Sequence, residues 1–340
     1  MTHQMTNFLC DPRDEPVLSL KNETLALNHI ATLMGAEAER AVLNGAPDEA
    51  RLALARCVFR EAGMAAVAQF YENDGWVQLG LSPCPGMRAA LYREVEKLLA
   101  RLRGRFQVRA AFFMHKPPGL RLRVQAALTD AGALGFEMAD AARGWREAGL
   151  VSDVREEIYE PETTLFGGAG SMRHVHGLFS EDSGFWLAHH ARPEQGERTL
   201  EVALILLRYV FSGLGVVDWE DIDVWEKVRS RTGRAFPEGF DADGSALGEV
   251  GATILRLWSE PGGVLRALDA RTRARTERAG ARLVKLAADW KAECFDAGRA
   301  GTGVRSAAAL YTIFFFNRAE LPLERQIIVA ETLASRQVME

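Results

Sequence analysis

Two arginines, Arg121 and Arg123, stand two residues apart in a segment over 120–125 that alternates charged and apolar residues. Side chains two apart on a strand project to the same face, so this spacing predicts a pair of guanidinium groups that could hold one carboxylate. The pair ends a stretch over 88–123 with ten Lys or Arg residues, opposed locally by only two glutamates. The alternative interpretation is an edge strand whose charges protect against aggregation.

Acidic residues gather beside a glycine turn further along the chain. Arg155 precedes Glu160 and Glu162, and Gly167-Gly168 follows. Paired carboxylates can act as acid and base when their environments drive their pKa values apart, and an exposed acidic end of a strand is the alternative. The glycines indicate a backbone turn, because neither the GxGxxG nor the GxxxxGK phosphate-binding pattern is present.

Histidines occur as two close pairs, His174 with His176 and His189 with His190. With Asp182 they resemble a metal-binding group, but the spacing lacks the HExxH pattern and no cysteine pair supports it, so we expect no metal. His176 is the preferred candidate for a general base, because the ordinary pKa of imidazole lies near neutral pH. The alternative is a structural histidine that bonds the backbone at the start of a helix.

Composition limits the class of protein. The 340 residues are 48% hydrophobic and 26% charged, as in one or two globular domains, and the net charge of −5 argues against a general nucleic-acid binder. The four cysteines lie far apart, the N-terminus lacks a secretory signal, and the longest apolar run, 202–207, is too short to cross a bilayer. These features predict a cytoplasmic protein without a disulfide framework, a membrane segment or direct DNA contact.

Hydrophobic spacing predicts the elements that position these residues. Apolar residues three and four apart predict a helical N-terminal extension within residues 1–70, from about Leu18. Residues 71–340 then form one domain, with strands predicted at 75–81, 106–115, 120–125 and 154–159, a turn at 116–119, and helices over 87–102 and up to Arg146. Further helices are predicted over 199–212, 218–230, 247–258, 271–296 and, as a pair, 306–338. This order predicts an α+β fold, a mainly helical domain around a small, mostly antiparallel sheet, rather than a repeated βα barrel.

Several strings occur together in the order found in one known family. They are Trp76-Val77-Gln78, the segment from Phe112 to Arg123 with its Lys116-Pro117-Pro118-Gly119 turn, Ile158-Tyr159-Glu160-Pro161-Glu162 with Phe166-Gly167-Gly168, His176-Gly-Leu-Phe, Asp182-Ser183 and Asn317-Arg318. Over about residues 71–335 the chain therefore resembles the thiopeptide-type bacteriocin biosynthesis domain. That domain is the C-terminal elimination part of class I lanthipeptide (lantibiotic) dehydratases, and it also occurs alone in thiopeptide pathways.

The resemblance implies a lyase that acts on a ribosomal precursor peptide with a leader. A separate tRNA-dependent component esterifies Ser or Thr with glutamate; the elimination domain then removes the α-proton and expels glutamate, leaving dehydroalanine or dehydrobutyrine. No metal or organic cofactor is implied. Arg121 and Arg123 would hold the α-carboxylate of the leaving glutamate, and the other expected catalytic residues are His176 and Tyr311. The expected substrate-binding residues are His115, Lys116, Arg155, Glu160, Glu162, Asn317 and Arg318.

Two positions depart from the family pattern. Phe315 stands where elimination enzymes carry a histidine before the Asn-Arg pair, and Leu165 where some members carry an arginine. Tyr311, one helical turn before Phe315, could supply a phenolic acid or base. Pyridine synthases, which share the fold and join two dehydroalanines in a formal (4+2) cyclisation with loss of the leader peptide, are the alternative. A third hypothesis is a non-catalytic partner that binds peptide and organises the glutamylating component.

Overall fold

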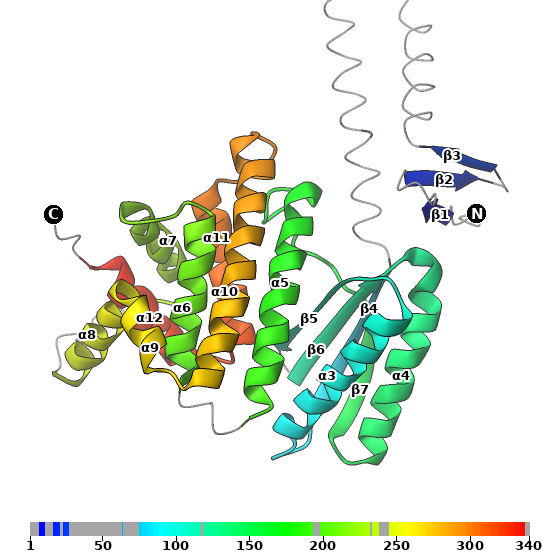
Figure 1. The fold of residues 1–340 in the computed structure, drawn as a ribbon, viewed down its shortest axis with the longest axis horizontal. Helices are drawn as coiled ribbons and strands as arrows, with labels where there is room; N and C mark the ends of the chain where they lie inside the picture. Colours follow the sequence, from blue (N-terminus) through cyan, green and yellow to red (C-terminus); the bar gives the residue numbers. More distant parts are fainter. Residues whose placement is uncertain are drawn as a thin grey trace, which may run out of the picture.

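The chain folds into a small sheet flanked by two helices and a larger group of helices beside it (Figure 1). The computed structural model describes residues 7–10, 16–20, 23–26, 63, 75–116, 119–192, 198–231, 233–237 and 245–336. This arrangement confirms the predicted α+β class, a mainly helical domain around a small antiparallel sheet. In the part of the chain that is described, no helix is both long and apolar enough to cross a membrane.

Four antiparallel strands form the sheet, in the order β5-β6-β4-β7. They are β4 (Trp76–Pro83), β5 (Val108–Lys116), β6 (Gly119–Ala126) and β7 (Val151–Glu157). Each overlaps a strand predicted from alternation, although β7 begins and ends earlier than expected. Of the turn predicted between β5 and β6, residues 117–118 lie outside the described residues.

The register of the strands collects polar side chains on one face. Gln78 on β4 lies opposite Arg123 on β6 and Glu157 on β7, and two residues further on Gly80 lies opposite Arg121 and Arg155. Directly opposed residues share a face, and so do residues two apart. The prediction that Arg121 and Arg123 share one face is therefore confirmed, and the register adds a glutamine and a glutamate to them.

The other face of the sheet is apolar and covered by helices. The side chains of Leu79, Leu81, Leu120 and Leu122 on this face are fully buried. They lie under α3 (Arg88–Arg105) and α4 (Ala131–Glu147), which follows the short turn η2 (Leu128–Asp130). The buried residues of α3 recur three and four apart, as the predicted helix requires: Leu91, Val95, Leu98, Leu99 and Leu102.

Helix α5 (Ala169–His190) covers the free edge of β5. The backbone N–H groups of Ala111 and Phe113 donate to the hydroxyls of Ser180 and Ser183, at 3.0 and 3.2 Å. These bonds satisfy edge groups that could otherwise pair with another strand. The sequence did not predict this helix, because it is buried on most of its circumference and so lacks an amphipathic repeat.

The remaining helices pack beyond α5 and bring the end of the chain back to the sheet. They are α6 (Thr199–Gly213), α7 (Trp219–Ser230), α8 (Ser245–Ser259), α9 (Pro261–Ala267), α10 (Ala270–Trp290) continued by the π-helical turn η4 (Lys291–Asp296), α11 (Val304–Arg318) and α12 (Leu323–Ala334). All but α9 are predicted, and the helix expected over 271–296 changes to π geometry after Trp290. Close packing of α6 on α10 requires Gly213, because a Cβ there would collide with the backbone of Val284.

The beginning of the chain contains strands where a helix was expected. β1 (Asn7–Cys10), β2 (Pro16–Leu20) and β3 (Glu23–Ala26) form a three-stranded antiparallel sheet. The predicted start of helix at about Leu18 is therefore wrong: the Val-Leu-Ser-Leu run of β2 alternates over too few residues to reveal its period. The remainder of the predicted helical extension, apart from the helical Gly63, lies outside the described residues.

Candidate functional site

The polar face of the sheet meets helix α5 at a group of six side chains, which we call the arginine cluster. Its members come from β4, β6, β7, the segment after β7 and α5: Gln78, Arg121, Arg123, Glu157, Tyr159 and His176. Three predicted catalytic residues, Arg121, Arg123 and His176, therefore lie close together. The register of β4 with β6 and β7 and the passage of α5 along β5 produce this proximity.

Arg123 is the buried cation of the cluster, with 5% of its surface exposed. Its Nε donates to the side-chain oxygen of Gln78 at 2.5 Å, and its guanidinium carbon lies 4.4 Å from the centre of the Tyr159 ring. Burial lowers the pKa of Arg123, and Glu162 is among the groups that oppose this effect. Arginine nevertheless stays charged in proteins. Among the described residues, no acceptor contacts the Nη atoms of Arg123, which leaves two donor groups for a carboxylate.

Arg121 is more exposed and is paired with an acid. Its Nε lies 3.3 Å from Oε2 of Glu157, and the Gln78 amide donates to the same oxygen at 2.7 Å. Gly80 permits this arrangement, because a Cβ there would lie 3.1 Å from the Glu157 carboxylate. The two arginines therefore differ in their partners. Glu157 partly neutralises the charge of Arg121, whereas the guanidinium of Arg123 stacks on the Tyr159 ring and could bind an anion.

Tyr159 and His176 form a hydrogen-bonded pair next to the arginines. The Tyr159 hydroxyl and His176 Nε2 are 2.8 Å apart, and the imidazole is 3% exposed, beneath the ring of Trp76 at 4.7 Å. Burial, aided by the charge of Arg123, lowers the pKa of His176 to about 3, so the ring is neutral at pH 7. Burial also raises the pKa of Tyr159, which keeps the phenol protonated. A protonated phenol beside a neutral imidazole can donate its proton to Nε2.

Tyr311, expected to be catalytic, belongs to a different group. Its hydroxyl donates to Asp182 at 2.6 Å, and Arg318 binds the same carboxylate through Nε and Nη2 at 2.5 and 2.6 Å. Tyr311, Asp182 and Arg318 are all completely buried. We call them the α11 triad. The ring of Phe179 is stacked on Tyr311 and also packs on Phe112, so an aromatic layer lies between this triad and the arginine cluster.

The α11 triad argues against the catalytic role expected for Tyr311 and the substrate-binding role expected for Arg318. A phenol whose hydroxyl is bonded to a fully buried carboxylate has no access to substrate, and the same holds for Arg318. The bonds instead tie α11 to α5, which is a positioning function. Phe315, at the position of the expected histidine, is also fully buried and packs on Trp186 at 5.5 Å between ring centres.

His115 and Asn317, expected to bind substrate, meet at the C-terminal end of α11. The Nδ1 atom of His115 lies 2.7 Å from the Asn317 carbonyl, and its Nε2 atom lies 2.6 Å from the Tyr92 hydroxyl. His190 contacts the next carbonyl, that of Arg318, at 3.0 Å. The final carbonyls of a helix lack partners within the helix, and these histidines supply them. Both nitrogens of His115 are therefore occupied, which favours a capping role over substrate binding.

The other expected substrate-binding residues lie on or near the polar face. Lys116 is partly exposed at the end of β5, and Arg155 is exposed and paired with Asp153 at 2.8 Å. Glu160 is exposed, whereas Glu162 is half-buried and close enough to act on the pKa values of Arg123 and Tyr159. Of these four residues, Glu162 is the one that lies close to the arginine cluster, as its effect on Arg123 and Tyr159 indicates.

Sequence reasoning missed Gln78 and Tyr159 as site residues. Both stood inside the strings that carried the family resemblance, but neither was distinguished there by charge or by spacing from another reactive residue. The two histidine pairs do not converge: His174 faces Glu293 at 3.2 Å, and His189 bonds Thr199 at 3.0 Å. Within the described residues, no group of three or more His, Cys, Asp or Glu residues is arranged to hold a metal ion.

The largely buried histidines predict that acid destabilises the fold. Burial lowers the pKa to about 3 for His115, His176 and His189 and to about 4 for His190. Between these values and the ordinary value of 6.5 the unfolded chain binds protons that the folded chain does not. We therefore expect the free energy of unfolding to fall as the pH drops below 6.5, by up to about 1.4 kcal/mol per pH unit and histidine.

Urea unfolding between pH 7.5 and pH 5 tests this expectation. A variant with His190→Gln, which keeps a donor for the Arg318 carbonyl, is expected to have a shallower dependence on pH than the unmodified chain. A midpoint that does not change over this interval would contradict the buried, neutral state of these rings.

Comparison with known proteins relates this geometry to a family. Residues 76–338 match the family described as lantibiotic biosynthesis dehydratase, C-terminal. A similar solved structure is that of the tRNA-dependent lantibiotic dehydratase MibB from Microbispora sp. 107891, with 17% sequence identity and a TM-score of 0.57. The match covers 77% of this chain and 28% of that chain. At 17% identity the similarity concerns the fold alone. No curated protein sequence matches the chain.

Proposed function

On the premise that the chain belongs to the lantibiotic biosynthesis dehydratase C-terminal family, which the match over 76–338 establishes, we propose that it is a lyase that eliminates glutamate from a modified peptide. The substrate is a ribosomal precursor peptide whose Ser or Thr side chains carry a glutamyl ester. The products are dehydroalanine or dehydrobutyrine and free glutamate. The observation that carries the proposal is the proximity of the buried Arg123, whose Nη atoms contact no acceptor among the described residues, to a hydrogen-bonded phenol and imidazole.

Arg123 supports the departure of the glutamate. In the elimination the bond from Cβ to the ester oxygen breaks, and its electron pair leaves with the glutamate carboxylate. Guanidinium donors in a buried site stabilise such a developing negative charge, since few water molecules compete there. Arg121 provides a second cation on the same face of the sheet, and Glu157 holds its side chain in position.

Tyr159 and His176 support removal of the α-proton. The Tyr159 oxygen takes the proton from Cα while the phenol proton passes to His176 Nε2, over the 2.8 Å hydrogen bond. The electrons of the Cα–H bond form the new double bond as the carboxylate leaves. The imidazolium produced is disfavoured beside Arg123, so after the product leaves it gives its Nε2 proton back to the Tyr159 oxygen as the phenol releases the proton taken from Cα to water. His176 Nε2 therefore accepts the proton from the Tyr159 hydroxyl and does not contact the substrate Cα itself.

The proposal includes partners. We infer that a leader region of the precursor peptide brings the substrate to the chain, and that a separate component adds glutamate from glutamyl-tRNA. We also propose that residues 71–340 act as one catalytic domain, that no metal or organic cofactor takes part, and that the reaction occurs in the cytoplasm.

Mass spectrometry of a glutamylated precursor peptide incubated with the chain tests the reaction. The expected result is loss of the mass of glutamic acid at each modified residue. In the variant Arg123→Met, which keeps the side-chain volume over Tyr159, we expect about 10²–10³ lower turnover, the range for removing one donor to a developing negative charge. Arg143→Met, on the exposed side of α4, is the matched control and should keep full turnover.

Two other outcomes would replace the proposal. Cyclisation of a multiply dehydrated peptide with loss of its leader, without action on the glutamylated peptide, would identify a pyridine synthase. No change in either peptide, combined with binding of the glutamylating component, would identify a non-catalytic partner.

A further inference from the structure

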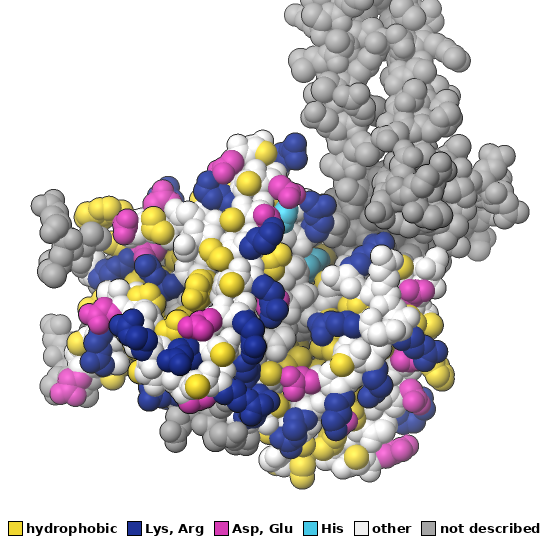
Figure 2. All heavy atoms as spheres, viewed as in Figure 1, with side chains coloured by type: hydrophobic (Ala, Val, Ile, Leu, Met, Phe, Trp, Pro, Cys, Tyr) yellow, Lys and Arg dark blue, Asp and Glu magenta, His cyan; other side chains and the backbone are white. Residues whose placement is uncertain are grey.

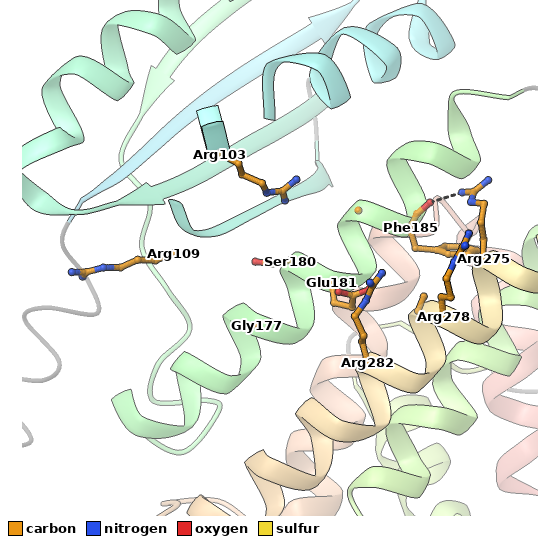
Figure 3. Close-up of a pocket in the computed structure, with 11 residues that line it drawn as sticks. Arg103, Arg109, Gly177, Ser180, Glu181, Phe185, Arg275, Arg278 and Arg282 are labelled. Carbon is orange, nitrogen blue, oxygen red and sulfur yellow. Dashed lines mark hydrogen bonds and ion pairs between the residues drawn. The ribbon is translucent and has the colours of Figure 1, made fainter. Parts of the chain in front are cut away.

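A second group of arginines surrounds a pocket on another side of α5. The pocket has a volume of about 580 Å³ and lies between α3, the beginning of β5, α5 and α10 (Figure 3). Its lining includes five arginines and a single acid, Glu181. The arginines are Arg103, Arg109, Arg275, Arg278 and Arg282. None of these arginines belongs to the arginine cluster. The two groups lie on different sides of α5: His176 faces Trp76 on the sheet, whereas Gly177 and Gly184 line the pocket.

Helix α10 contributes one wall with a regular spacing. Arg275, Arg278 and Arg282 are three and four residues apart, so they lie along one side of the helix, facing α5 in Figure 3. Figure 2 shows Lys and Arg side chains gathered in a band along the seam between these two helices. Like charges three and four residues apart repel one another and destabilise the helix. A bound anion would offset this repulsion, so the stripe of arginines indicates an anion-binding surface.

Helix α5 contributes a floor in which two glycines and a serine lie beside Glu181 and Phe185. Gly177 and Gly184 are seven residues apart on one side of the helix, with Ser180 between them. Glycine inside a helix costs about 1 kcal/mol relative to alanine. Packing does not require either glycine, since a Cβ at 184 would meet no atom within 4 Å and one at 177 would make an ordinary contact of 3.7 Å. The missing side chains leave the space that forms the pocket.

Among the described residues, acidic side chains balance only part of the positive charge of the pocket. Glu181 is paired with Arg282 at 2.6 Å, and Arg275 donates to the Phe185 carbonyl at 3.2 Å. Among the described residues, no acidic side chain pairs with Arg103, Arg109 or Arg278. Burial lowers the pKa of Arg275, and the charges of Arg192, Arg271 and Arg278 lower it further, while Glu96 acts in the opposite direction. The local field is therefore strongly positive in a chain whose net charge is −5.

We propose that this pocket binds a ligand that carries two or more adjacent phosphate groups, either a free polyphosphate or nucleotide or the backbone of an RNA. Guanidinium groups bind phosphate oxygens in a bidentate manner. A polyphosphate places several negative charges within a few atoms, and an RNA backbone places one at each nucleotide, so either could meet several arginines around one pocket of this volume. An acidic peptide would need several side chains with their stems and backbone to supply the same charge.

Isothermal titration of the full chain with three probes tests the proposal. The probes are inorganic triphosphate, a short single-stranded RNA and an oligoglutamate peptide of equal charge. Binding of triphosphate or RNA that exceeds binding of oligoglutamate supports the proposal. A preference for triphosphate over RNA indicates a free ligand, and the reverse preference indicates an RNA backbone. Failure of both phosphate probes, or equal binding of oligoglutamate, would overturn it.

Matched variants locate the binding. Arg103→Gln combined with Arg278→Gln is expected to weaken phosphate binding at least about tenfold, because each removes a charge-assisted hydrogen bond. Arg143→Gln combined with Arg146→Gln removes the same charge from exposed positions on α4 and should leave the affinity unchanged. Gly184→Met keeps every arginine and favours the helix, yet fills the floor of the pocket, so it should also weaken binding. If Gly184→Met binds phosphate like the unmodified chain, the ligand does not occupy this pocket and the proposal fails.

Discussion

Replacing Tyr159 by Phe is expected to lower the turnover of a glutamylated peptide by about 10²–10⁴-fold, the range for loss of a general acid–base group. The substitution keeps the ring on which Arg123 is stacked at 4.4 Å and removes only the hydroxyl that contacts His176 Nε2. We expect a fall in kcat with little change in KM, because Arg121 and Arg123 still bind the leaving carboxylate. The unpaired nitrogen left on His176 is also expected to cost about 1–3 kcal/mol of stability.

Steady-state rates of Tyr159→Phe and of Tyr209→Phe test this role. Tyr209 lies on α6, away from the arginine cluster, and packs against Gly280, so its variant controls for loss of a phenol as such. Its rate should equal that of the unmodified chain. An unchanged kcat in Tyr159→Phe would remove the hydroxyl from proton transfer, and a raised KM with normal kcat would assign it to substrate binding instead.

The arginine cluster combines a permanent cation with groups that burial keeps neutral. Arg123 retains its charge because no accessible pH removes it, while His176 and Tyr159 are held as imidazole and phenol. A charged histidine would have repelled Arg123 and could not accept a proton. The same burial therefore prepares the anion site and the proton acceptor, and binding of a carboxylate on Arg123 would make protonation of His176 easier.

The sheet and its arginines could be predicted because their patterns are local. Alternation located β4, β5 and β6, and the period of two placed Arg121 and Arg123 on one face. Which residues lie opposite them was not predictable, because register depends on how separate strands pair. Gln78, and the contact of Glu157 with Arg121, therefore entered the site only with the fold. The helices α7 and α10 likewise had a one-sided apolar stripe.

Two elements that escaped prediction or were misjudged, α5 and α11, are among the most buried. Helices α5 and α11 are enclosed on most sides, so their sequences do not distinguish the side that faces a site from the side that faces the core. The spacing placed Tyr311 one turn before Phe315. Nothing in the sequence indicated that the Tyr311 hydroxyl would donate a hydrogen bond to Asp182. The same limit applies to the basic pocket, whose arginines come from three separate elements.

Loss of the Asp182 carboxylate is expected to have the largest effect on stability. Asp182→Ala should lower the free energy of unfolding by about 3–5 kcal/mol, the range for breaking a buried ion pair, because it leaves the charge of Arg318 buried without a partner. Burial raises the pKa of Asp182, and the charge of Arg318 and the bonds from Arg318 and Tyr311 oppose that effect. Asp140→Ala on the exposed side of α4 removes a surface pair with Arg143 and should cost less than about 1 kcal/mol.

Urea unfolding of these variants, together with turnover measurements, separates the stabilising role of the α11 triad from a role in catalysis. Asp182→Leu combined with Arg318→Met removes both charges and should be more stable than Asp182→Ala, since a buried pair can be replaced by apolar side chains at little cost. Tyr311→Phe removes one bond to a charged group, so about 1.5–3 kcal/mol should be lost while turnover of the folded protein stays unchanged. A large fall in kcat for Tyr311→Phe without loss of stability would return this tyrosine to the chemistry. That result would also require the α11 triad to open toward the arginine cluster, past the ring of Phe179.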